Sequence, residues 1–281
     1  MSPELCPEPR SGDTSVFPSR YLVPTISIVH LSISVVIITL NEEANLARTL
    51  QSVAWADEIV VVDSGSTDRT REIAASFHTN FSLEPWRGFA AQKNFALSKA
   101  SCDWVLSLDA DEEVEPALAD EIRATVAANP STPGFFIPRK NFFLGRWIRH
   151  GGFYPDPKLR LFRRGSGQFE DRLVHEDVRV NGPTARLKHH LLHHAYPTLD
   201  SYVDHMNRYS SLGAQMTTSE GRRSFSFVNI VIRPRITFFY NYLLRGGFLD
   251  GREGLLLHLY HAEYVSWKYA KAWELGRKQH R

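Results

Sequence analysis

The sequence predicts an α/β protein, with a doubly wound sheet of alternating strands and helices followed by a helical C-terminal extension. Three observations predict this fold class. Short β-branched runs alternate with segments of helical apolar spacing between Ile33 and Ala128. Polar clusters follow the ends of three of these runs. Residues 225–273 combine aromatic side chains with arginine and lysine, and none of their apolar stretches is long enough to span a membrane.

The first strand–helix unit begins at the continuous β-branched run Ile33–Thr39, which is typical of a strand buried on both faces of a sheet. Asn41 is expected to cap the following helix, in which Leu46, Leu50 and Val53 fall at helical spacing. Although residues 22–40 are nearly free of charge, their proline, histidine and serines favour a loop and a strand over a membrane span.

The alternation then continues through further units. Their elements, in chain order, are a strand at 58–62, a Gly/Ser turn at 63–68, a helix at 70–77, a short strand near 81, a helix at 90–100, a strand at 104–108 and a helix at 116–128 that opens with proline. Repeated units of this kind predict a parallel sheet with its ligand crevice at the carboxyl ends of the strands.

Polar clusters stand at three such strand ends. They are Thr39-Asn41-Glu42, Asp63 with Asp68, and Asp109 with Asp111. Alternate side chains of an extended chain share a face, so Asp109 and Asp111 are expected to point at one object. Paired carboxylates suit a hard divalent cation that holds phosphate oxygens. The glycine patterns of dinucleotide-binding and P-loop enzymes are absent, which argues against both classes.

Charge distribution and cysteine content indicate the kind of partner and the cellular compartment. The net charge is only +2, but residues 222–281 carry 11 Lys/Arg against 4 Asp/Glu, which suggests an anionic partner for the back of the chain. The chain has 2 cysteines, Cys6 and Cys102, and neither lies in a C-x-x-C pair. This usage favours a reducing compartment.

With these residues in place, the chain resembles the family-2 inverting, nucleotide-sugar-dependent glycosyltransferases. The matching segments are Val35–Glu43, Val61–Asp68, Gln92–Asn94 and Leu108–Glu112. More narrowly, the segments Tyr154–Arg163, Leu173–Glu176 and Gly247–Gly251 look like the bacterial branch that includes lipopolysaccharide-core β-glucosyltransferases.

The resemblance implies a GT-A fold with a doubly wound mixed sheet, in three regions. Residues 1–31 would be a flexible N-terminal extension, 32–220 the catalytic domain, and 221–281 a helical region that associates with a membrane or packs on the domain. It also implies residue roles: a nucleotide pocket lined by Thr39, Asn41, Glu42, Asp63 and Asp68, with Lys93 near the base or diphosphate. Asp111 would bind Mg²⁺ or Mn²⁺, and Asp109 would face the ribose or the metal.

An inverting transfer needs one base to take the proton of the acceptor hydroxyl. The resemblance points to Glu176, with Asp177 as the neighbouring alternative. In an extended segment the two side chains point in opposite directions, so only one of them can serve. A surface ion pair with a nearby arginine is the other reading of Glu176.

Two further sets of residues are candidate ligands. His193, within a cluster of four histidines, matches best the late histidine that family members often supply as a metal ligand; ordinary packing is the alternative. Arg160 and Arg163 could hold a diphosphate or an anionic acceptor through their planar guanidinium groups, or be ordinary arginines of a strand edge.

The aromatic and basic extension suits helices that lie in the plane of an anionic bilayer surface. The alternative is that its aromatics close the core or a dimer interface. No recognised nucleic-acid module is present, so nucleic acid is not expected as a partner.

The leading hypothesis is therefore a metal-dependent transferase that moves a sugar, glucose from a UDP donor by the family resemblance, to a lipopolysaccharide-core or other lipid-anchored acceptor. Its expected place is the cytoplasm, peripheral on the inner face of the cytoplasmic membrane. The alternatives are a nucleotidyltransferase, which also uses paired aspartates and a metal, and a nucleotide-sugar-binding protein without catalysis.

Overall fold

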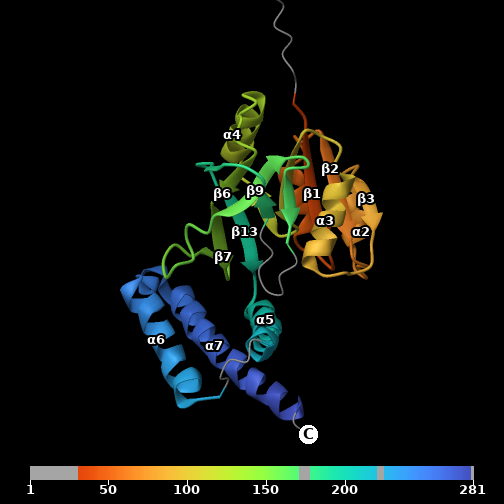
Figure 1. The fold of residues 1–281 in the computed structure, drawn as a ribbon. Coiled ribbons are helices and arrows are strands. Elements are labelled where there is room, and N and C mark those ends of the chain that lie inside the picture. Colours follow the sequence, from red (N-terminus) through yellow and green to blue (C-terminus); the bar gives the residue numbers. More distant parts are fainter. Residues whose placement is uncertain (1–30, 171–177, 220–224, 280–281) are drawn as a thin grey trace, which may run out of the picture. The chain divides into compact units, whose positions relative to one another are not determined.

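The computed structural model describes residues 31–170, 178–219 and 225–279 (Figure 1). The expected N-terminal extension, apart from Leu31, lies outside the described residues.

The main sheet has the strand order β12-β6-β9-β4-β1-β2-β3. Its strands are β1 (Ile33–Thr39), β2 (Glu58–Asp63), β3 (Asn80–Leu83), β4 (Trp104–Asp109), β6 (Gly134–Ile137), β9 (Lys158–Arg163) and β12 (Thr184–Arg186). The helices between them are α1 (Leu46–Ser52), α2 (Thr70–Ser76), α3 (Phe89–Lys99) and α4 (Pro116–Ala127). Each predicted strand and helix of this part is therefore present, within a few residues of its expected bounds.

The central strands are buried on both faces, as their β-branched sequence predicts. Val35 and Ile37 pack into one hydrophobic cluster with residues of α1 and α4. Val36 faces the other way, into a cluster that contains Ala96 of α3. Helices therefore cover both faces, which is the doubly wound arrangement.

The sheet is mixed rather than all parallel. β1 pairs in parallel with both β2 and β4, but β9 runs antiparallel to its neighbours β4 and β6. This confirms the mixed sheet implied by the resemblance and corrects the all-parallel sheet expected from the repeated units. The alternation of strands and helices ends after α4, so no crossover helix forces β9 to be parallel.

The cap predicted at Asn41 is wrong. The helix begins only at Leu46, and Asn41 adopts a left-handed conformation with φ 55°. The Asn41 side chain instead accepts a hydrogen bond from the backbone N–H of Thr67, at 2.8 Å. The residue thus joins the first strand end to the second.

A smaller sheet follows, with the strand order β5-β13-β7-β8, and β10 pairs with β11. These strands are β5 (Glu112–Val114), β7 (Arg139–Phe143), β8 (Arg146–Trp147), β10 (Gly167–Phe169), β11 (Val178–Val180) and β13 (Leu191–Tyr196). β5 follows β4 after a single turn, so the chain passes from one sheet to the other at Ala110 and Asp111.

The C-terminal part is helical, as predicted. It comprises α5 (Leu199–Ser219), the π-helical η1 (Val228–Ile232), α6 (Arg233–Phe239), the π-helical η2 (Tyr240–Leu244), the 3-10 turn η3 (Gly247–Asp250) and α7 (Gly251–Gln279). α7 packs against both α5 and α6, and α6 and α7 lie side by side in Figure 1. α5 belongs to this packing, so the helices that pack together include residues from Leu199 onward. In the part of the chain that the structure describes, no helix has the length and apolar character to cross a membrane.

Candidate active site

The three predicted strand-end clusters meet at one edge of the main sheet, the carboxyl edge. Thr39 is the register partner of Asp63, and Ile38 is the partner of Asp109. This arrangement follows from the parallel pairing of β1 with β2 and β4. The carboxyl edge is therefore where the candidate site lies.

Asp109 is held by two cations of the protein. Its Oδ1 lies 2.8 Å from Lys93 Nζ, and its Oδ2 forms a close ion pair with the guanidinium of Arg160. Burial alone would raise the pKa of Asp109, but Arg160 and Lys93 hold that pKa well below its usual value. Both carboxylate oxygens thus already have cationic partners.

Glu112 and Arg139 extend this network into the core. Glu112 is fully buried and lies 2.6 Å from Arg160 and 2.9 Å from Arg139. Arg139 also forms an ion pair with Asp156, from the loop before β9. Buried charges persist only where they are paired in this way. The sequence reasoning missed these residues: Glu112 and Asp156 stand inside the quoted segments, whereas Arg139 carries no signal of its own.

Asp111 has a different partner, His193. β4 ends at Asp109, and the following turn carries Asp111 to β13, where its Oδ2 lies 3.4 Å from His193 Nε2. The backbone fixes this position, because His194 N–H donates to the carbonyl of Asp111 at 3.0 Å. Burial opposes ionisation, but His193 holds the pKa of Asp111 below its usual value. The two aspartates therefore do not share one object as the extended pattern predicted.

The donor set fits one divalent cation. Among the described residues, no group of three or more His, Cys, Asp or Glu side chains is arranged to hold a metal. Asp111 and His193 nevertheless supply an oxygen and a nitrogen close enough to serve as neighbouring ligands. Mg²⁺ in phosphate-handling sites typically takes only one or two protein carboxylates, with substrate oxygens and water completing its shell. Asp111 and His193 would hold the cation, and Asp109 is already engaged.

The nucleotide side of the site is a compact pair of loops. Asp63 is buried and accepts hydrogen bonds from Gly65 and Ser66 N–H, at 3.0 and 2.9 Å. Asp68 accepts from the N–H of Glu43 at 3.1 Å and of Thr70 at 3.0 Å. These carboxylates therefore shape the loops through backbone contacts.

Thr39 and Glu42 are two further polar residues beside these loops. The hydroxyl of Thr39 is buried and has no hydrogen-bond partner among the residues that the structure describes, which suits a group that binds a ligand. Burial raises the pKa of Glu42, and the carboxylates of Asp111 and Asp68 add to this effect. A ligand that brings positive charge or a hydrogen-bond donor would relieve this acidic cluster.

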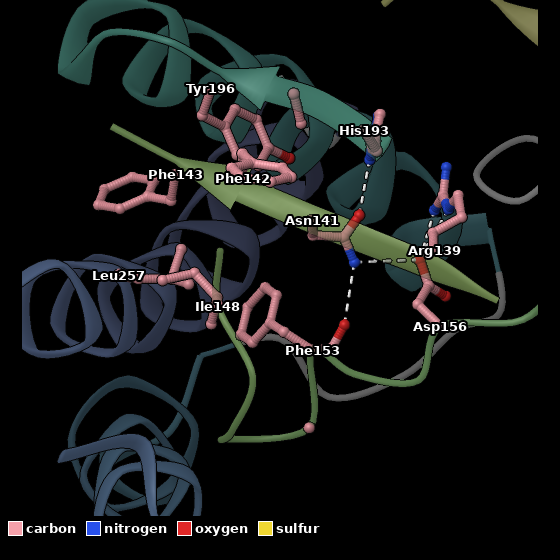
Figure 2. A pocket seen from close by; sticks show the side chains of 12 residues that line it. Arg139, Asn141, Phe142, Phe143, Ile148, Phe153, Asp156, His193, Tyr196 and Leu257 are labelled. Atoms are coloured by element: carbon pink, nitrogen blue, oxygen red, sulfur yellow. Dashed lines mark hydrogen bonds and ion pairs between the residues drawn. The ribbon is translucent and has the colours of Figure 1, made fainter. Parts of the chain in front are cut away.

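A pocket of about 260 Å³ adjoins His193 (Figure 2). One end is polar and the other is apolar. The polar side chains are Arg139, Asn141, Asp156 and His193, and the apolar end is formed mainly by Phe142, Phe143, Ile148, Phe153, Tyr196 and Leu257. A pocket with this division suits a sugar ring that presents hydroxyls to one side and a carbon face to the other.

The Gly247–Gly251 segment anchors one wall of this pocket. The buried Asp250 accepts hydrogen bonds from the backbone N–H groups of Arg149 and His150, at 3.2 and 2.8 Å. Its Oδ1 also lies 2.9 Å from His150 Nδ1. Asp250 therefore ties the loop that carries Phe153 to the C-terminal helices.

The structure corrects the prediction for Arg163. Because β9 is antiparallel to β4, Arg163 pairs with Trp104 at the start of β4, on the edge opposite to Asp109. Its guanidinium donates to Asn129 and to the carbonyl of Pro130, and it lies over the Trp104 ring. Arg160 does reach the site, but it is buried in ion pairs with Asp109 and Glu112 rather than open to a diphosphate. The candidate bases Glu176 and Asp177 lie outside the described residues.

Comparisons with known proteins agree with this geometry. The sequence model of the family described as Glycosyl transferase family 2 matches residues 34–187. The chain is 33% identical to the lipopolysaccharide core biosynthesis glycosyltransferase LpsC of Rhizobium meliloti, over 88% of this chain and 94% of that protein. It is 31% identical to the uncharacterized glycosyltransferase RT0209 of Rickettsia typhi, over 88% of each.

A solved structure shows the same fold. The mannosyltransferase PcManGT of Pyrobaculum calidifontis, in complex with GDP-Man and Mn²⁺, matches with a TM-score of 0.52 at 18% identity. The match covers 86% of this chain and 87% of that one. At this identity the likeness concerns the fold alone.

Proposed function

This chain belongs to glycosyl transferase family 2, and from that premise we propose that it is an inverting, metal-dependent glycosyltransferase. The proposed donor is a nucleoside-diphosphate sugar, with UDP-glucose as the first expectation. The proposed acceptor is a lipopolysaccharide-core or other lipid-anchored glycan. Family membership favours a sugar transferase over both the nucleotidyltransferase and the binding protein without catalysis.

The observation that carries the proposal is the pairing of Asp111 with His193 at the carboxyl edge, beside a pocket of about 260 Å³. A divalent cation held there would neutralise the charge that builds on the departing diphosphate. Lys93 and Arg160 keep Asp109 ionised and hold its side chain in place, so this part of the site is ordered before a substrate binds. Thr39 and the loops around Asp63 and Asp68 would bind the nucleotide.

In the transfer itself, an acceptor hydroxyl oxygen forms a bond to the anomeric carbon while the bond from that carbon to the diphosphate oxygen breaks. The hydroxyl proton passes to a base on the opposite face of the sugar. Glu176 is the proposed base, with Asp177 as the alternative. The name of the relative LpsC supports a lipopolysaccharide-core acceptor.

The helical region carries a surface suited to a lipid-anchored acceptor. An apolar stripe on η1, α6 and η2, here called the C-terminal apolar face, comprises Val228, Ile232, Ile236, Phe239 and Leu243. These side chains recur every three or four residues, which puts them on one side of the helix, and each is exposed to solvent.

Exposed arginines accompany the C-terminal apolar face. Among residues 225–252, Arg233, Arg235, Arg245 and Arg252 are exposed. The single acid of the same stretch, Asp250, is buried. An exposed apolar stripe flanked by cations suits a surface of anionic lipid. We therefore propose peripheral contact with the anionic inner face of the cytoplasmic membrane.

A donor screen tests the proposed function. The purified protein is incubated with Mn²⁺, a lipopolysaccharide-core acceptor and each of several nucleotide sugars, and release of nucleoside diphosphate is measured. We expect release with one donor, its loss in EDTA and its loss in Asp111→Ala. Full turnover by Asp111→Ala in EDTA would refute the metal-dependent mechanism.

A further inference from the structure

We propose that Asn141 is a positioning residue for His193: it fixes the ring orientation and holds a hydrogen on Nδ1, so that Nε2 is the ring nitrogen that faces Asp111 and the proposed cation site. Figure 2 shows the contact between Asn141 and His193. This inference rests on the proposed metal-dependent function, in which Asp111 and His193 hold the cation.

The amide orientation of Asn141 is fixed by its surroundings. Its Nδ2 lies 3.0 Å from the carbonyl oxygen of Phe153 and 3.4 Å from a carboxylate oxygen of Asp156. Both partners are acceptors only, so the amide must turn its NH₂ group toward them. The carbonyl Oδ1 then faces the opposite way, toward β13.

That carbonyl decides the tautomer of His193. Asn141 Oδ1 lies 2.7 Å from His193 Nδ1, and an amide oxygen can only accept. Nδ1 therefore carries a hydrogen, and Nε2 is the ring nitrogen left to bind a cation. Nε2 is the atom that lies 3.4 Å from Asp111.

The strand register holds these groups together. β7 and β13 run parallel, and His193 is the register partner of Asn141. On its other side, β13 pairs with β5, where His193 is opposite Glu112. The three side chains Asn141, His193 and Asp111 thus form a row from β7 across β13 to the turn before β5.

A neutral imidazole with a free Nε2 is the form that binds a divalent cation, and the partner of the other ring nitrogen normally fixes it. Removing such a partner typically lowers metal affinity by about 10–100-fold. Without Asn141, the ring of His193 could rotate, or carry its hydrogen on Nε2.

The test measures binding of Mn²⁺ alone to the full-length protein, by the electron paramagnetic resonance signal of free Mn²⁺. We expect Asn141→Leu to weaken binding by about 10–100-fold. Asn141→Asp keeps an acceptor for Nδ1–H but loses the hydrogen bond to Phe153. The Mn²⁺ affinity of this variant should stay within a few-fold of the wild-type affinity. The matched control is Asn207→Leu on α5, which removes a 2.6 Å hydrogen bond from Lys271 of α7; this variant should bind Mn²⁺ as tightly as the wild type does.

A second readout concerns the metal-free protein. Long-range ¹H–¹⁵N spectra, with the signal assigned by His193→Ala, should show hydrogen on Nδ1 in the wild type and a shift toward Nε2 in Asn141→Leu. Equal losses of Mn²⁺ affinity in Asn141→Leu and Asn141→Asp, or an unchanged tautomer in Asn141→Leu, would overturn the inference and leave Asn141 as an anchor of the Phe153 loop.

His193→Ala separates this inference from the proposed function. If His193→Ala binds Mn²⁺ as tightly as the wild type, the proposed metal site fails, and the inference fails with it. If His193→Ala loses binding but Asn141→Leu does not, the inference about Asn141 alone fails.

Discussion

Arg160 forms a buried ion pair with Asp109, so the first aspartate of the D-x-D pattern is held by the protein itself. Asp111, the second aspartate, is directed instead toward His193. The two carboxylates therefore have different roles. Asp109 stabilises the buried network of ion pairs, and Asp111 is available to bind a cation.

Substituting each aspartate separately should reveal this division. We expect Asp109→Asn to lower the free energy of unfolding by about 3 kcal/mol, because it removes one partner from a buried charge network. Asp111→Asn should leave stability close to that of the wild type but weaken Mn²⁺ binding by at least about tenfold, by loss of a carboxylate ligand. Urea denaturation and Mn²⁺ titration measure the two effects. An Asp109→Asn protein of unchanged stability would contradict the structural role.

The proposed base, Glu176, is tested by replacing its carboxylate with an uncharged amide of nearly the same shape. Glu176→Gln should lower kcat by about 10²–10⁴-fold, the usual contribution of a general base, with little change in donor binding. Asp177→Asn is the matched control, since its side chain is expected to point the other way. The reverse pattern, with Asp177→Asn inactive and Glu176→Gln active, would transfer the role to Asp177. Single-turnover transfer assays distinguish the two.

Acid stability should depend on Asp156. Burial opposes its ionisation, but Arg139 and Lys158 lower its pKa from 3.8 to about 2. A carboxyl with a depressed folded pKa contributes stability above its unfolded pKa, and that contribution is lost as the pH falls from about 4 to about 2. The shift corresponds to about 2 kcal/mol.

Asp156→Asn should accordingly be less stable than the wild type at pH 7, with the difference shrinking toward pH 2. Asp204→Asn, at an exposed position of α5, is the control and should follow the wild-type curve. Urea denaturation at a series of pH values gives the comparison. A constant difference between Asp156→Asn and the wild type across this range would contradict the assignment.

Membrane contact is tested with vesicles. Ile236→Asp and Phe239→Asp should each weaken binding to anionic phospholipid vesicles by about tenfold or more, because a large apolar side chain contributes about 1.5–3 kcal/mol on burial. Leu83→Asp places the same charge at a similarly exposed leucine on β3 and should bind as the wild type does. Sedimentation with vesicles measures the bound fraction.

Two outcomes would count against the membrane proposal. Equal binding to neutral and anionic vesicles would remove the role of the arginines. If the wild type fails to sediment with vesicles but is dimeric by light scattering, and Ile236→Asp is monomeric, the C-terminal apolar face is a subunit interface instead.

Arg163 is not expected to contribute to binding of the nucleotide-sugar donor. Arg163→Ala is expected to leave the KM for the nucleotide sugar unchanged, because its guanidinium lies at the far edge of the sheet. Loss of its contact with the Trp104 ring should reduce stability by about 0.5–1 kcal/mol. Steady-state kinetics with a fixed acceptor measures the KM, and a several-fold increase would restore the role predicted from the sequence.

The sequence by itself determined the alternation of strands and helices from β1 to α4 and the edge at which the site lies. The β-branched run at Ile33–Thr39 and its successors are local patterns, and parallel strands bring their carboxyl ends together without further information. The positions of Thr39, Asp63 and Asp109 at one edge could therefore be predicted. The helical extension with its aromatics and arginines was equally visible.

Only the tertiary structure decided which of these groups touch one another. The antiparallel direction of β9 placed Arg160 under Asp109 and carried Arg163 away from the site. The register of β7 against β13 brought Asn141 to His193. Strand direction and register depend on pairing between segments distant in sequence, and a shift of one residue turns a side chain to the other face. No local pattern along the chain encodes those pairings.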